Sequence, residues 1–115
     1  MHTVVETPAF LAAAAKAGVT GAEREDMVSI IASNPMSGDE IPGSGGYRKV
    51  RFAGKGKGKS GGYRIITFYS GKNVPIFLIT VFGKGMKANL SKAEVNALSA
   101  MSKKLIGTYA KRPFL

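Results

Sequence analysis

The stretch SGGYRKVRFAGKGKGKSGGYRII, residues 44–66, organises the rest of the chain and holds its strongest chemical signal. Its two flanks alternate polar and apolar residues as β-strands do, and its centre is a glycine-lysine loop that cannot pack a core. From Arg48 to Arg64 it contains seven Lys or Arg residues and no Asp or Glu. Two strands joined by this loop would gather positive charge into one patch, and such a patch attracts a polyanion.

The residues around this stretch predict two more strands and three helices. Strands are expected at about 2–7, 47–53, 62–70 and 75–82, where β-branched and aromatic residues are enriched. A first helix is expected from Pro8 until Gly18 stops it, and a second over about 21–33 behind a Thr20/Glu23 capping box. The two helices should form an antiparallel hairpin.

The remaining segments complete the chain. Residues 34–46 are rich in Gly and Pro and should form an ordered but irregular loop. Ser91 and Glu94 form a second capping-box pattern before a last helix over about 92–106, which Gly107 is expected to end. The order of strand, two helices, three strands and helix predicts one α+β domain over 1–115, with a small, mostly antiparallel sheet, an N-terminal helical hairpin and a C-terminal helix.

Charge is divided unevenly along the chain. Residues 1–40 carry two basic and six acidic side chains, whereas residues 41–115 carry fifteen basic and one acidic, which together give the net charge of +10. The C-terminal two thirds should therefore present a positive field to an anionic partner, with nucleic acid as the leading candidate and a merely solubilising surface as the alternative.

Several classes of protein are disfavoured by what the sequence lacks. No apolar run approaches about 18 residues, so no membrane span is expected, and the start of the chain does not resemble a secretion signal. The absence of cysteine excludes disulfides and cysteine chemistry. A cytoplasmic location fits these features.

The usual catalytic inventories are almost empty as well. His2 is the only histidine, and the acidic residues do not show the clustering that a metal site needs, so neither metal nor cofactor is expected. The segment from Lys55 to Ser60 superficially resembles a phosphate-binding loop. The required frame needs glycine where Ala53 stands and a helix after the serine, so nucleotide binding is rejected.

One reaction suits these residues, namely RNA cleavage by attack of a ribose 2′-hydroxyl on its own 3′-phosphate. It needs no metal and no nucleophile on the enzyme, but it does need positive charge on the pentavalent transition state. Lys49 and Arg51 should share the open face of their strand, because Val50 and Phe52 belong to the core. Arg64 is basic within an otherwise apolar strand, so it should be either paired or functional, and function is favoured.

Further residues are expected to contact RNA around this centre. Lys84 and Lys87 follow the apolar strand and should lie beside the same patch. Tyr47 and Tyr63 could stack a splayed base or could equally be ordinary strand aromatics. The RNA-binding set is completed by Arg48, Lys55, Lys57 and Lys59.

With these residues in view, the chain resembles the HigB branch of the RelE/ParE superfamily of bacterial toxins. The resemblance lies in five stretches that follow one another in the right order and cover most of the chain. They are VVETPAF at 4–10, IPGSGGYRKVR at 41–51, GKSGGYRII at 58–66, LITVFGK at 78–84 and NLSKAE at 89–94.

The resemblance implies a compact α+β toxin that cuts mRNA, commonly in the ribosomal A site. It also implies a cognate antitoxin with a helix-turn-helix domain. The toxin–antitoxin pair would bind operator DNA only through that antitoxin. The family's catalytic positions match Lys49, Arg51 and Arg64, and Lys84 less closely. The chain has Leu90 where RelE proper has a tyrosine, so the general acid and base stay unassigned.

Two other functions remain open at this point. The same patch could serve a non-enzymatic module that binds nucleic acid or the ribosome, or the fold could belong to a ParE-like gyrase poison. Retention of the basic set at Lys49, Arg51, Arg64 and Lys84 favours the endoribonuclease over the gyrase poison.

Overall fold

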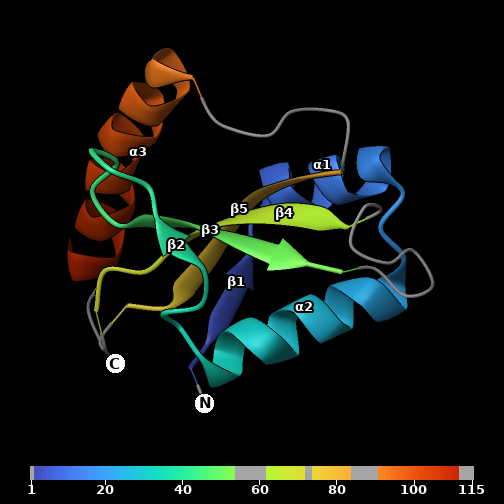
Figure 1. The fold of residues 1–115 in the computed structure, drawn as a ribbon. Helices are drawn as coiled ribbons and strands as arrows, with labels where there is room; N and C mark the ends of the chain where they lie inside the picture. The colour runs from blue at the N-terminus through green and yellow to red at the C-terminus, as the bar shows by residue number, and fades with distance from the viewer. Residues whose placement is uncertain (1, 54–61, 72–73, 84–90, 112–115) are drawn as a thin grey trace.

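A five-stranded sheet forms the centre of the computed structural model, which describes residues 2–53, 62–71, 74–83 and 91–111 (Figure 1). In chain order the elements are β1 (Val4–Glu6), α1 (Pro8–Ala17), α2 (Gly21–Ser33), β2 (Asp39–Glu40), β3 (Tyr47–Phe52), β4 (Tyr63–Phe68), β5 (Ile76–Gly83) and α3 (Lys92–Lys111). This arrangement confirms the predicted α+β class and the mostly antiparallel sheet.

The strands lie in the order β1-β5-β4-β3-β2. β1 runs parallel to β5, and the other neighbours are antiparallel. The pairing of β4 with β5 shifts register between Ile66 and Thr67, so β5 holds one extra residue at this point. The central position of β4 and β5 explains why both strands are almost continuously buried.

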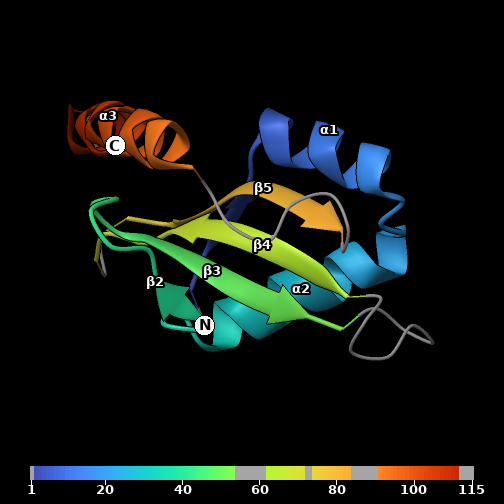
Figure 2. The same ribbon diagram turned by 45° about the horizontal axis from the view of Figure 1, so that its top comes forward.

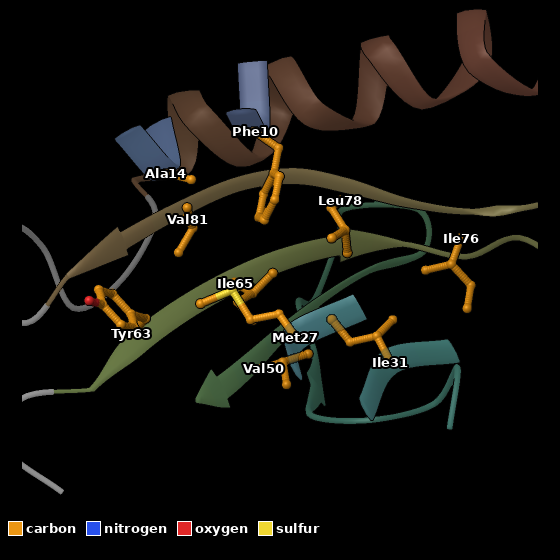
Figure 3. Close-up of a cluster of buried hydrophobic side chains, with 10 residues drawn as sticks. All are labelled: Phe10, Ala14, Met27, Ile31, Val50, Tyr63, Ile65, Ile76, Leu78 and Val81. Carbon is orange, nitrogen blue, oxygen red and sulfur yellow. The ribbon is translucent and has the colours of Figure 1, made fainter. Parts of the chain in front are cut away.

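Alternation along the strands divides the core between the two faces of the sheet. One cluster includes Phe10 and Ala14 of α1, Met27 and Ile31 of α2, and Val50 of β3, so both N-terminal helices pack on this face (Figure 3). The second cluster includes Tyr47 and Phe68, and Leu98 of α3 packs against it. Figure 2 shows α3 at the end of the sheet where β3 begins. The far end of that second face carries the site described below.

Side-chain caps fix the starts of the helices where the sequence predicted them. The Thr7 hydroxyl accepts from the Phe10 amide at 3.1 Å and donates to the Leu78 carbonyl at 2.7 Å, which joins α1 to β5. Thr20 and Glu23 form the predicted capping box, and so do Ser91 and Glu94. Caps of this kind typically contribute about 1 kcal/mol each.

Two expectations about the secondary structure were wrong. The segment 34–46 is not wholly irregular, because it contains the two-residue strand β2, which pairs with Arg48 and Lys49 of β3. The last helix does not end at Gly107 but continues to Lys111. A glycine inside a helix costs only about 1 kcal/mol relative to alanine, so it does not force an end where the flanking residues favour helix. Within the described residues, no helix combines the length and the apolar character needed to cross a bilayer.

Candidate active site

Three of the predicted catalytic residues lie on one face of the sheet. Val50 and Ile65 point into the core that α1 and α2 cover. Residues of odd number on β3 and of even number on β4 therefore point to the opposite face. Lys49, Arg51 and Arg64 are such residues, which is the arrangement that strand alternation predicted for Lys49 and Arg51.

The strand register brings two of these cations together. Arg51 of β3 is directly opposite Arg64 of β4. Directly opposed residues have Cβ atoms about 5 Å apart, so the two guanidinium groups can reach a common ligand. Arg51 is exposed and Arg64 is partly buried beside Phe82, its partner on β5. In the part of the chain that the structure describes, neither arginine forms an ion pair or a side-chain hydrogen bond.

Two like charges directly opposed in a sheet destabilise it, and a stability argument alone gives no reason to keep them. A ligand with two or more anionic oxygens removes this cost, because each guanidinium can bind a pair of oxygens in its plane. Lys49 lies two residues along β3 on the same face, so a third cation borders the same surface.

A small cavity lies where the ends of β3 and β4 meet. It has a volume of about 80 Å³ and is lined by Arg51, Phe52, Ala53, Gly62 and Arg64. Gly62 allows the close approach of the two strand ends, because a Cβ there would come within 2.8 Å of the Phe52 carbonyl oxygen. The two arginines thus border a hollow rather than a flat surface.

The two tyrosines expected near the RNA do not present their rings to solvent. Tyr47 is 0% exposed and its ring packs on Phe68 at a centroid distance of 4.8 Å. Burial raises the pKa of Tyr47 to about 12. Tyr63 is 2% exposed, stacks on Phe52 at 6.5 Å and donates a hydrogen bond to Glu23 at 3.4 Å. The base-stacking prediction was therefore wrong for both, and they are core aromatics.

Arg48 lies on the opposite face from Arg51 and Arg64. Its guanidinium donates to the Ser37 carbonyl at 3.2 Å and to the Gly38 carbonyl at 2.8 Å. These bonds hold the segment before β2 against β3. The predicted contact of Arg48 with RNA gains no support from this position, and a structural role explains the residue.

The other predicted site residues, Lys55, Lys57, Lys59, Lys84 and Lys87, lie outside the described residues. His2, which the sequence gave no catalytic role, has its Nε2 atom 3.1 Å from the Tyr69 hydroxyl. Across the described ranges, no three His, Cys, Asp or Glu side chains gather as a metal site would require.

One polar residue on the face that carries Lys49, Arg51 and Arg64 was not predicted. Asp39 of β2 is opposite Lys49 in the register and therefore shares its face. A two-residue strand is too short for hydrophobic periodicity to reveal. The available signal was the acidic pair 39–40 directly before the turn that leads into a basic strand.

Comparison with known families agrees with this architecture. Residues 5–112 match the model of the RelE family, described as the RelE toxin of the RelE/RelB toxin-antitoxin system. The match spans all of the described strands and helices except the first residue of β1. The chain therefore belongs to the RelE toxin family.

Proposed function

We propose that this toxin is a metal-independent endoribonuclease that cuts mRNA, and that it does so on the ribosome. RelE toxins are in general mRNA-cleaving endoribonucleases that inhibit translation. The observation that supports the same activity here is the pair Arg51 and Arg64, directly opposed on the open face with Lys49 beside them. A gyrase poison gives no reason for this pairing, whereas a binding module would use it to hold phosphate without cutting, and the test below separates that alternative.

The proposed reaction begins with a scissile phosphate seated between the two arginines. Each guanidinium binds non-bridging oxygens, and the bonds strengthen as charge develops on the pentavalent phosphorus. The 2′-oxygen attacks in line and the 5′-oxygen departs, which leaves a 2′,3′-cyclic phosphate and a 5′-hydroxyl. Lys49 supplies a third positive charge beside this centre.

The lysines outside the described residues complete the proposal. Lys84 is proposed as a further catalytic cation, on the strength of its place directly after β5. Lys55, Lys57, Lys59 and Lys87 are proposed to grip flanking phosphates. Contacts of this kind would make binding fall steeply with salt.

The proposed partners are mRNA, the ribosome and a cognate antitoxin. The family is defined by toxin–antitoxin pairs, so an antitoxin partner is expected. An antitoxin with a helix-turn-helix domain, which would carry the pair to operator DNA, and membership of the HigB branch both remain proposals from the sequence resemblance.

The test is brief induction in cells, followed by mapping of transcript 5′ ends. Wild type, Lys49→Ala and Arg64→Ala are compared at equal protein levels, with Lys16→Ala as a charge-matched control on α1. We expect new 5′ ends inside translated messages and growth arrest for wild type and Lys16→Ala, and neither for the other two. Arrest with intact messages and broken chromosomes would instead identify a gyrase poison. Arrest with intact nucleic acids would identify a binding module.

A further inference from the structure

Among the described strand residues, Asp39 is a carboxylate on the same face as Lys49, Arg51 and Arg64. Asp39 is directly opposite Lys49, so its Cβ lies about 5 Å from that of Lys49 and about 7 Å from that of Arg51, the diagonal neighbour. The next residue, Glu40, is opposite Arg48 and points to the other face. Asp39 is exposed, and its side chain has no hydrogen-bond or ion-pair partner within the described ranges.

A carboxylate at this position is a cost for a surface that only binds RNA, because it repels the phosphate that Arg51 and Arg64 attract. A surface that cleaves RNA needs such a group. The attacking 2′-hydroxyl must lose its proton, and an arginine cannot accept one because it stays protonated. Among the described residues that the register brings to this face, Asp39 is the carboxylate that can take that proton.

We infer that Asp39 is the general base of the cleavage reaction, an inference that rests on the proposed endoribonuclease function. The charged groups that face it from β3 are Lys49 directly and Arg51 diagonally. The edge position of β2 leaves Asp39 open to substrate while its backbone is fixed by pairing with β3.

Asp39 and Lys49 can together accept and return the protons that the cleavage step requires. The 2′-hydroxyl proton passes to Asp39 while the bond from the 2′-oxygen to phosphorus forms. The bond from phosphorus to the 5′-oxygen breaks, and that oxygen takes a proton from the Lys49 ammonium. The neutral amine of Lys49 then recovers a proton from the Asp39 carboxylic acid, which restores both groups.

The test is single-turnover cleavage of mRNA on programmed ribosomes by purified Asp39→Asn, with Glu40→Gln as the matched control on the same strand. A general base contributes typically 10²–10⁴-fold, so we expect a loss in that range for Asp39→Asn and less than threefold for Glu40→Gln. Both variants should melt at the wild-type temperature, because both side chains are exposed.

A modified substrate separates a base from an acid. An RNA with sulfur in place of the bridging 5′-oxygen at the cleavage site has a leaving group that needs no proton. It should restore cleavage by Lys49→Met but not by Asp39→Asn. Equal restoration of both variants would overturn the assignment of Asp39 as base, as would wild-type cleavage by Asp39→Asn or a lowered melting temperature of that variant alone.

The cleavage rates of wild type and Glu40→Gln separate the role of Asp39 from the endoribonuclease function on which it rests. Failure of wild type and Glu40→Gln to cut ribosome-bound mRNA would overturn the endoribonuclease proposal and, with it, the role of Asp39. Cleavage by both of these together with unimpaired cleavage by Asp39→Asn would overturn the role of Asp39 alone.

Discussion

The opposition of Arg51 and Arg64 predicts a measurable repulsion in the folded protein. With Cβ atoms about 5 Å apart, the guanidinium centres are about 7 Å apart. Two unit charges at about 7 Å repel by roughly 0.6 kcal/mol in water. At physiological ionic strength, where the Debye length is about 8 Å, screening reduces this to roughly 0.3 kcal/mol. Because Arg64 is partly buried, salt screens its charge less, and the repulsion at low salt should be close to the unscreened value of roughly 0.6 kcal/mol.

A double-mutant cycle measures this repulsion directly. The free energy of unfolding is determined by urea denaturation for wild type, Arg51→Gln, Arg64→Gln and the double variant, at about 10 mM and 500 mM salt. We expect the two arginines to be coupled unfavourably by about 0.5 kcal/mol at low salt, equivalent to roughly 3 °C in melting temperature. The coupling should fall below about 0.2 kcal/mol at high salt, since the Debye length is then only a few ångströms.

The control cycle pairs Arg64→Gln with Lys16→Gln, which removes the same charge from the last turn of α1. Its coupling energy should be near zero, because distant charges without shared partners behave additively. A favourable coupling between Arg51 and Arg64, or one that does not change with salt, would contradict the predicted repulsion. Either result would mean that the two guanidinium groups do not face each other across the strands, or that counterions lie between them.

Three further predictions concern the residues around the site. Tyr47→Phe should leave the free energy of unfolding unchanged or slightly raised at pH 7, because the buried hydroxyl lacks a partner among the described residues. Wild-type stability should fall as the pH rises from about 10 to about 12, because tyrosine ionises in the unfolded chain while the folded group does not. Urea denaturation across that range should show a smaller fall for the variant. Arg48→Gln should lower the free energy of unfolding by about 1–3 kcal/mol in the same assay, since it removes two charged hydrogen bonds to backbone carbonyls. Gly38→Ala should lower the free energy of unfolding by at least about 1 kcal/mol, because Gly38 has a φ of 82° and an added Cβ would overlap the Lys49 carbonyl oxygen. An undiminished melting temperature would contradict the close packing of Gly38 against β3.

The fold was readable from the sequence where local signals agree with one another. The Thr20/Glu23 and Ser91/Glu94 capping boxes marked two helix starts, and both form in the structure. The β-branched and aromatic runs gave β3, β4 and β5 to within two residues. These signals depend on neighbours in the chain, so they survive without knowledge of the tertiary structure.

What the sequence could not give depends on contacts between distant segments. β2 exists only because it pairs with β3, and two residues show no period of their own. The burial of Tyr47 and Tyr63 is decided by what covers each face of the sheet, and residue type leaves this open. Alternation placed Lys49 and Arg51 together, but only the register between β3 and β4 shows that Arg51 opposes Arg64.

The most direct test of the central claim is the single-turnover rate at which Arg64→Gln cuts ribosome-bound mRNA, with identification of the new 3′ end. We expect a 2′,3′-cyclic phosphate from wild type and a rate lower by about 10²–10³-fold in the variant, the usual cost of removing one group that stabilises developing charge. The melting temperature should not fall. A variant that cuts at the wild-type rate would contradict the claim that Arg64 helps to hold the scissile phosphate.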